Sequence, residues 1–210
     1  MWLQTRRQFP ANSPFTQNYV QAQGNGQKPH EIIELALIPI CARSICEDEV
    51  KQWLIRPNSP ITPQATNLHG ITNTDVADHP TFKELSIIIE KGLGQEILIG
   101  HYVQVDHLLI QAQLPHWKPM LVIDTIKLAK AVAPNLKSYS LTALIDEFDI
   151  ADLPPGAQHR AMYDAFATAK LFLILIQRLD GDGQLTLAKL AELGASPNDP
   201  YFLSIQRGLF

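Results

Sequence analysis

The sequence predicts an α/β fold of three layers, in which a mixed central sheet is flanked by helices. Two observations support this class. Apolar strands come first as a meander, and from residue 81 onward strands alternate with helices. A meander adds antiparallel strands, whereas strands separated by helices usually pair in parallel. With 210 residues, of which 46% are apolar, the chain can form one domain with a sizeable core.

The first part of the chain is predicted to form the antiparallel side of the sheet. Residues 1–14 form an irregular N-terminal arm, and residues 15–20 form a short strand. The Gln-Gly-Asn-Gly sequence at residues 23–26 indicates a turn. Residues 31–40 (EIIELALIPI) are so densely apolar that we expect a buried strand. Residues 44–56 then form the return strand.

The middle of the chain begins with a long loop. Residues 57–80 are rich in Pro, Asn and Thr, and a short helical piece is expected at residues 62–68. Residues 81–91 form an amphipathic helix. A short apolar strand at residues 96–100 and a helix at residues 105–113 follow.

The last third repeats the alternation of strand and helix. We expect a strand at 119–124, followed by helices at 125–132 and 140–148, the second with Ser140 as its N-cap. A longer helix then runs from the loop at 154–156 to about residue 179, and a last helix covers residues 185–193. We therefore divide the chain into the arm at 1–14, a main domain at 15–180, and a C-terminal helix and tail at 181–210.

Charge and cysteine content narrow the function and the location. The net charge of −4 excludes a grossly basic protein that coats nucleic acid, although a local basic groove remains compatible with it. Cys41 and Cys46 make no convincing disulfide framework, so we expect reduced thiols and a cytoplasmic location. The sequence has no apolar run of about 20 residues, so we expect no membrane association.

Three stretches place titratable side chains at the ends of predicted elements. His159 and Asp164 lie at a loop–helix junction, where they could act as a general base beside a metal ligand or be a solvated surface pair. Asp106 lies at the start of a helix, where it could be a metal ligand or could simply complement the helix dipole. Asp124 ends a strand, and α/β folds build their sites at the carboxyl ends of strands.

These stretches occur in an order that resembles one enzyme family. The quoted motifs are Leu68-His-Gly-Ile-Thr, Gly100-His-x4-Asp106, Asp124-Thr, Tyr139-Ser-Leu and His159-Arg-Ala-x2-Asp164-Ala-x-Ala-Thr. Together they are similar to the DEDDh 3′–5′ exonucleases, the relatives of the proofreading epsilon subunit of bacterial DNA polymerase III and of ribonuclease T. The resemblance spans roughly residues 19–178 and is most specific in the last motif.

The resemblance implies a ribonuclease-H-like fold and hydrolysis of phosphodiesters with two metal ions. In such a site four carboxylates hold two Mg²⁺ or Mn²⁺ ions on the scissile phosphate, and a histidine deprotonates the attacking water. Carried onto this sequence, His159 matches the general base, and Asp106 and Asp164 match two of the metal ligands.

The resemblance also implies contacts with nucleic acid. The expected partners are single-stranded 3′ ends of DNA or RNA, a second copy of the chain, and a polymerase or another protein. His69, His101, Tyr102 and Arg160 are the candidate nucleic-acid-binding residues, and Tyr102 stands where the family commonly has Asn. Four lysines near the predicted site edge could join Arg160 in a basic groove or form a solvated helix face; they are Lys118, Lys127, Lys130 and Lys137.

The first motif departs from the family. Counting back from Gly24 places Tyr19 where the family has the bridging Asp, and Gln21 where it has Glu. No Asp or Glu occurs before Glu31, so the missing carboxylates cannot come from the first strand. The phenol of Tyr19 and the amide of Gln21 are neutral, so they do not replace the two missing negative charges. Mg²⁺ prefers anionic oxygen ligands.

The prediction is therefore an exonuclease-like protein in which hydrolysis is weak or lost. One alternative is an active metal-dependent exonuclease with rearranged ligands, in which Glu31 or Glu34 supplies a carboxylate. The other alternative is a non-catalytic subunit that binds proteins.

Overall fold

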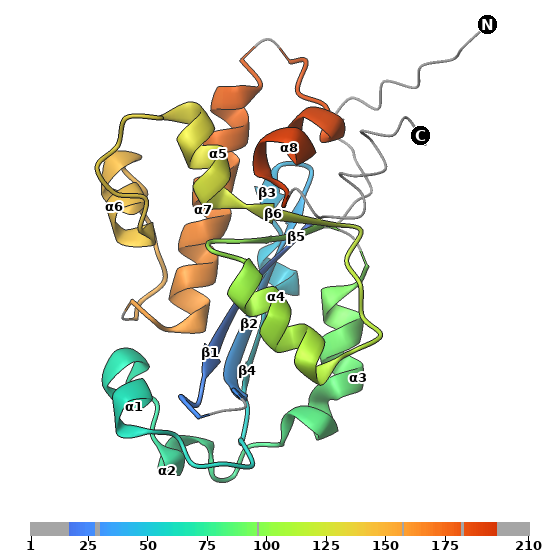
Figure 1. Ribbon diagram of the computed structural model, residues 1–210, viewed down its shortest axis with the longest axis vertical. Coiled ribbons are helices and arrows are strands. Elements are labelled where there is room, and N and C mark those ends of the chain that lie inside the picture. The colour runs from blue at the N-terminus through green and yellow to red at the C-terminus, as the bar shows by residue number, and fades with distance from the viewer. Residues whose placement is uncertain (1–16, 28–29, 96, 157, 182, 197–210) are drawn as a thin grey trace, which may run out of the picture.

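A six-stranded mixed sheet organises the molecule, with helices packed on both faces (Figure 1). The computed structural model describes residues 17–27, 30–95, 97–156, 158–181 and 183–196. The strands run in the order β3-β2-β1-β5-β6, and β4 also pairs with β2. Their bounds are β1 Gln17–Gly24, β2 Ile32–Cys41, β3 Ser44–Ile45, β4 Lys51–Leu54, β5 Ile97–Gly100 and β6 Leu121–Asp124. The predicted three-layer α/β fold is confirmed.

Strand β1 joins the antiparallel and parallel parts of the sheet. It pairs antiparallel with β2 along its whole length and parallel with β5 only over residues 17–19. β5 in turn pairs parallel with β6. The carboxyl ends of β1, β5 and β6 therefore meet at one edge of the sheet, where α/β folds place their sites.

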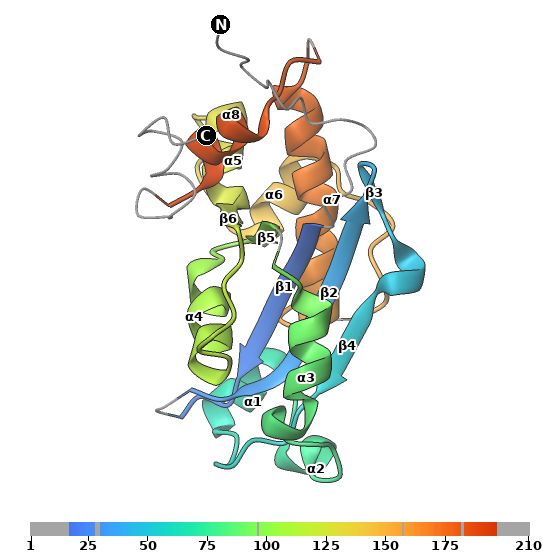
Figure 2. The ribbon, with the colours of Figure 1, turned by 90° about the vertical axis from the view of Figure 1, so that its right-hand side faces the viewer.

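The long helix α7 (Ala161–Leu179) covers one face of the sheet, across β1 and β2 (Figure 2). Buried alanines at 161, 165 and 169 follow the helical period and leave room for close packing. Three further helices complete this layer: α5 Thr125–Val132, α6 Leu141–Glu147 and α8 Leu187–Gly194. Ser140 caps α6 as predicted, since its Oγ accepts a hydrogen bond from the N–H of Ala143.

The opposite face is covered by α3 (Phe82–Leu93) and α4 (Gln104–Gln113), which pack on a second apolar cluster. The loop before α3 contains α1 (Pro63–His69), close to the expected helical piece, and α2 (Asn73–Val76), which was not predicted. α2 has only four residues, too few to show a helical period, but Thr72 and Asp75 form a capping box at its start.

The predicted return strand at residues 44–56 is wrong as one continuous element. β3 and β4 are separated by a 3-10 turn at Glu47–Glu49. Three consecutive acidic side chains lie exposed in that turn and none is buried. Of the apolar residues that suggested the strand, which are Val50, Trp53 and Ile55, only Trp53 lies in β4, where it packs against the second apolar cluster.

The expectation of two reduced cysteines is also wrong for this structure. Cys41 and Cys46 are joined in a disulfide across the β2–β3 hairpin, with their Cα atoms 6.0 Å apart. Two cysteines made no convincing disulfide framework, but a hairpin returns the chain to within disulfide range after a few residues. The cysteines therefore give no support to the cytoplasmic location, which stays a prediction.

The C-terminal helix belongs to the same apolar core as the main domain. α8 begins after the N-cap Thr186, and its Leu190 and Ala191 are buried against the α7 layer. The expected arm at 1–14 and the tail beyond residue 196 lie outside the described residues. Among the described helices, none combines the length and apolar character needed to cross a membrane.

Candidate functional site

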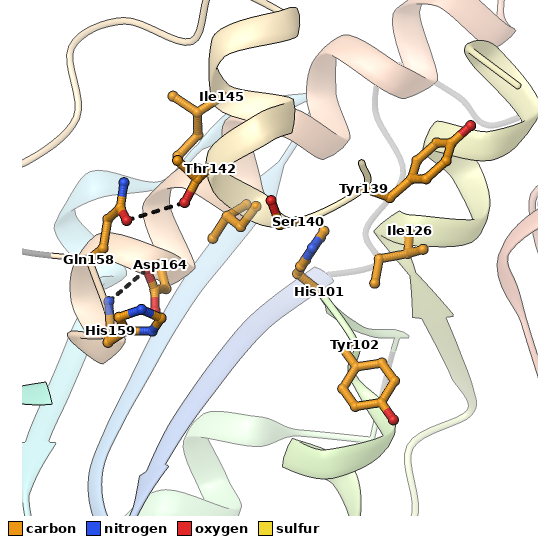
Figure 3. Close-up of a pocket in the computed structure, with 11 residues that line it drawn as sticks. His101, Tyr102, Ile126, Tyr139, Ser140, Thr142, Ile145, Gln158, His159 and Asp164 are labelled. Atoms are coloured by element: carbon orange, nitrogen blue, oxygen red, sulfur yellow. Dashed lines mark hydrogen bonds between the residues drawn. The ribbon is translucent and has the colours of Figure 1, made fainter. Parts of the chain in front are cut away.

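A pocket of about 580 Å³ opens where the carboxyl ends of β5 and β6 meet the start of α7 (Figure 3). This volume lies within the range of small-ligand sites, about 300–1,000 Å³. The side chains that line it come from five segments of the chain: His101, Tyr102, Ile126, Tyr139, Ser140, Leu141, Thr142, Ile145, Gln158, His159 and Asp164. The predicted His159, Asp164, His101 and Tyr102 are therefore brought together.

The start of α7 is held by a carboxylate from the sheet. Glu34 of β2 is fully buried, and its side chain accepts hydrogen bonds from the N–H of Ala161 at 2.8 Å and from the guanidinium of Arg160. Burial alone would raise the pKa of Glu34, but these hydrogen bonds and the charge of Arg160 hold it below its usual value. Glu34 thus supplies the N-terminal cap that no residue of α7 provides.

His159 precedes the helix in an unusual backbone conformation. Its φ is 66°, in the left-handed region that residues other than glycine rarely adopt. The N–H of His159 donates to Oδ1 of Asp164 at 3.4 Å, across the first turn of α7. Asp164 is buried, and burial raises its pKa to about 6 against the effect of that hydrogen bond. The predicted pair is therefore ordered by backbone contacts and lines one side of the pocket.

Asp106 lies in the first turn of α4 and is not among the residues that line the pocket. β5 pairs with only the first residues of β1, which leaves the N–H of Ala22 free to donate to Oδ1 of Asp106 at 2.8 Å. Burial raises the pKa of Asp106 to about 7, and the charges of Asp164 and Asp124 add to this shift. Asp106 therefore lies close enough to Asp164 and Asp124 for their negative charges to disfavour its ionised form.

The raised pKa of Asp106 gives a testable prediction for stability. Between the unfolded pKa of about 4 and the folded pKa of about 7, the native state binds more protons, so the free energy of unfolding falls as pH rises. Asp106→Asn removes the cost of burying the ionised carboxylate at high pH, and its amide oxygen can still accept the hydrogen bond from the N–H of Ala22. We expect the variant to be more stable than wild type by about 2–4 kcal/mol at pH 8 and equally stable below pH 4.

Urea unfolding across this pH range, with EDTA present, measures the difference. A constant offset between the two proteins at every pH would contradict the prediction, because it would show that Asp106 does not titrate between these limits. Asp146→Asn, a substitution on an exposed carboxylate of α6, serves as the control and should leave the pH profile unchanged.

Asp124 has a structural role at the end of β6. Its Oδ1 accepts from the N–H of Ile126 at 2.9 Å, which caps α5, and from the N–H of Tyr102 at 3.2 Å. Beside it, Thr125 Oγ donates to the carbonyl of Gly100 and lies 2.9 Å from Nδ1 of His101. Asp124 thus fixes the loop that carries His101 and Tyr102 into the pocket.

The register of β1 locates Tyr19 and Gln21, the two positions at which the family resemblance implies carboxylates. Tyr19 pairs with Ile38, and Gln21 pairs with Ala36. Ile38 and Ala36 belong to the core beneath α7, so these register positions lie on the α7 side of the sheet, which is the side of Asp164. The assignment of Tyr19 and Gln21 to the first-motif positions stays a prediction.

The donor set does not fit two divalent cations. Within the part of the chain that the structure describes, no group of three or more His, Cys, Asp or Glu side chains could hold a metal ion. The two suggested substitutes are already engaged. Glu34 is bound to Arg160, and Glu31 accepts hydrogen bonds from Asn58 and Ser59 of the following loop. Asp106 and Asp164 are thus the carboxylates left for a metal.

The other candidate nucleic-acid residues fall in different surroundings. His69 is buried, its Nδ1 accepts from the N–H of Ile71, and it is not among the pocket-lining residues. Arg160 points its guanidinium at Glu34. Of the lysines, Lys127 donates to the carbonyl of Ala195 and Lys130 lies over the ring of Tyr139. Arg160 and these two lysines are therefore engaged with groups of the protein itself.

Sequence reasoning missed the polar residues on the α6 side of the pocket. Gln158 Oε1 accepts a hydrogen bond from Thr142 Oγ at 3.2 Å, and both side chains line the pocket with Ser140 (Figure 3). The sequence signal that could have indicated Gln158 is its position next to His159. For Thr142 the signal is its position directly after the Tyr-Ser-Leu motif, to which we assigned no role.

The mixed sheet, with α7 packed across β1 and β2 and a pocket at the carboxyl ends of β5 and β6, defines a ribonuclease-H-like fold. Comparisons with known proteins are more specific. A family described as Exonuclease matches residues 20–172. Over 166 residues the chain is 30% identical to DNA polymerase III subunit epsilon of Aquifex aeolicus, covering 76% of this chain and 79% of that protein.

Two further relatives agree. Exodeoxyribonuclease 10 of Escherichia coli K12 is 32% identical over 169 residues, covering 80% of this chain and 70% of that protein. The solved structure of exonuclease X in complex with 5′-overhanging duplex DNA matches with a TM-score of 0.69 and 27% identity, covering 84% of this chain and 98% of that chain. The chain belongs to the DEDDh 3′–5′ exonuclease family.

Proposed function

We propose that this protein binds single-stranded 3′ ends of nucleic acid in the pocket at the start of α7 and hydrolyses them weakly or not at all. The observation that carries the proposal is the donor set: two carboxylates, Asp106 and Asp164, where the family uses four. Family membership and the pocket support the binding. The missing charges argue against efficient hydrolysis, because metal ions supply much of the stabilisation of the transition state in such sites.

The residues of the chain keep defined roles in this proposal. His159 is the candidate general base, held beside Asp164 by its backbone N–H. His101 and Tyr102 border the pocket from the opposite side, on the loop that Asp124 fixes. Mg²⁺ or Mn²⁺ would bind weakly at Asp164 and Asp106, since two carboxylates supply only part of the negative charge that two divalent cations require.

The test measures hydrolysis and binding on the same protein. Single-stranded DNA and RNA labelled at the 3′ end are incubated with Mg²⁺ or Mn²⁺ and with wild type or Asp164→Ala. We expect little or no release of mononucleotides by either protein, together with binding of the labelled strand by wild type. Rapid release that disappears in Asp164→Ala would overturn the proposal and establish an active exonuclease.

Two other functions remain as alternatives with their own support. The retained His159–Asp164 contact and the buried Asp106 favour an active nuclease with rearranged ligands. The Aquifex relative is named as a polymerase subunit, which favours a protein-binding role. Sedimentation of the isolated protein shows whether it forms a homodimer, and absence of any strand binding would leave the protein-binding role as the better account.

A further inference from the structure

The outer side of α3 presents apolar surface to solvent on the face of the sheet opposite α7 (Figure 2). Among the described large apolar residues, Ile87 is the most exposed, at 83%, and its neighbour Ile88 is 52% exposed. The buried residues of α3, which are Phe82, Ile89 and Leu93, lie on the other side of the helix. Single exposed apolar residues are common on protein surfaces, so the charges around Ile87 decide what this side of α3 can bind.

The charged residues around Ile87 read the same in both directions. Residues 83–91 contain the pattern Lys-Glu-x-x-Ile-x-x-Glu-Lys. Its five specified residues are all exposed and are called the α3 face: Lys83, Glu84, Ile87, Glu90 and Lys91. At about 100° per residue, Lys83 and Glu90 lie on one flank of Ile87, and Glu84 and Lys91 lie on the other. The α3 face is therefore neutral overall and symmetric about Ile87.

This pattern is complementary to a second copy of itself. A two-fold axis beside Ile87 would bring two α3 helices together antiparallel, each through the same face. Lys83, about 6 Å before Ile87 along the helix, then lies beside the partner's Glu90, about 4.5 Å from the same centre. Glu84 lies beside the partner's Lys91 for the same reason. The symmetry repeats both contacts, so opposite charges meet on each flank of the two isoleucines.

The charges of the α3 face are available for such contacts. None of the ion pairs among the described residues includes Lys83, Glu90 or Lys91. Glu84 uses one carboxylate oxygen, Oε2, to accept hydrogen bonds from Thr81 at the start of the helix, so the other oxygen can face a cation. A partner therefore gains these charges without breaking an ion pair within the described part of the chain.

A hollow beside Ile87 leaves space for a side chain of the partner. Its volume is about 260 Å³, and it is lined by Ile87, Glu90, Lys91, Gly94, Gln95 and Trp117. It lies along the second half of α3, which faces the start of the partner's helix when the two helices run antiparallel. A long side chain from that start can enter the hollow.

We propose that the α3 face binds the α3 face of a second copy of this chain, in an antiparallel pair about a two-fold axis. Ile87 packs on the partner's Ile87. The aliphatic part of Lys83 enters the partner's hollow, and its ammonium group meets the partner's Glu90. One helix face is small beside the roughly 800 Å² per partner of a stable interface, so the dimer is weak, with a Kd of about 1–100 µM.

The pairing is independent of the proposed function. Among the described residues that line the pocket at the start of α7, none belongs to α3. The two copies therefore need neither nucleic acid nor a metal ion to associate. Substitutions on the α3 face should leave the binding of a labelled single strand unchanged.

Sedimentation equilibrium between about 1 and 500 µM protein tests the pairing. Lys83→Glu and Glu90→Lys each place like charges against each other at both ends of the interface. We expect each variant to raise the Kd of the dimer about tenfold or more. The double variant Lys83→Glu/Glu90→Lys exchanges the two charges, which restores the attraction, and its Kd should return to within about threefold of wild type.

A mixture of the two single variants gives a second test. Lys83→Glu is acidic at both positions and Glu90→Lys is basic at both, so a mixed dimer pairs opposite charges at each end. We expect the mixture to dimerise at concentrations at which each variant alone is monomeric. Both substitutions suit the helix dipole, since the acid is added near the start of α3 and the base near its end. The fold should therefore be kept, which thermal unfolding verifies.

Leu68→Gln is the matched control for Ile87→Gln. Leu68 is 56% exposed on α1, outside the α3 face, so its substitution should leave the Kd of the dimer unchanged, whereas Ile87→Gln should raise it severalfold. A wild type that stays monomeric, a dimer that both single charge variants keep, or a mixture that does not dimerise would overturn the inference. Failure of wild type to bind any strand while the dimer behaves as expected would overturn the proposed function alone.

Discussion

Tyr19→Asp/Gln21→Glu should gain metal-dependent exonuclease activity on the order of 1,000-fold over wild type. The two positions lie in register with Ile38 and Ala36, on the side of the sheet that carries Asp164. Adding two carboxylates there restores the charge that two divalent cations require, and the ions supply several kcal/mol of transition-state stabilisation. Each 1.36 kcal/mol corresponds to a tenfold change in rate. Release of mononucleotides from a 3′-labelled strand measures the gain.

Two controls show whether the gain comes from the site. Asn18→Asp adds one carboxylate next to position 19, at a register position on the opposite face of the sheet, and should gain nothing. Asp164→Ala added to the double variant should remove the activity again. Addition of Mn²⁺ should raise the melting temperature of the double variant more than that of wild type. A double variant that binds Mn²⁺ but stays inactive would show that more than these two positions has been lost.

Glu34→Gln should destabilise the protein by about 2 kcal/mol, which is the second large effect we expect. The side chain of Glu34 is fully buried whereas that of Arg160 is 36% exposed, so the substitution mainly weakens hydrogen bonds to a charged group, which are worth about 1.5–3 kcal/mol each. Here the substitution strips Arg160 of its carboxylate and weakens the cap on Ala161. Chemical unfolding at pH 7 measures the loss.

The pH dependence identifies the ion pair as the cause. Because the pKa of Glu34 is lowered in the folded state, its contribution is present above the unfolded pKa of about 4.5 and disappears as pH falls through the folded value. The difference between wild type and Glu34→Gln should therefore shrink in acid. Glu192→Gln, which removes an exposed ion pair with Lys189, should cost less than about 1 kcal/mol. A similar loss from both substitutions would contradict the assignment.

Local sequence patterns were sufficient to predict the strands and helices whose apolar residues recur with a regular period. The dense apolar run of β2 and the small residues of α7 predicted both elements to within a few residues. The order of motifs singled out His159, Asp164, His101 and Tyr102, and all four side chains line one pocket in the structure. These features follow from periodicities of two and 3.6 residues, or from residues that are neighbours in the chain.

Contacts between distant residues could not be predicted in this way. Glu34 and Arg160 are separated by 126 positions, and nothing in either local stretch indicates that a strand carboxylate caps the helix. The left-handed backbone of Tyr102 depends on Asp124, on another strand. The Cys41–Cys46 bond needed knowledge of the hairpin that brings the two residues together.

The hydrogen bond from Ala22 to Asp106 has an evolutionary consequence. It joins the backbone of β1 to the second-motif aspartate, so this contact does not depend on which residues stand at positions 19 and 21. In the genetic code, a Tyr codon becomes an Asp codon, and a Gln codon becomes a Glu codon, by one nucleotide change each. Under the proposed function, two point mutations would therefore supply the two carboxylates that the family resemblance implies at these positions.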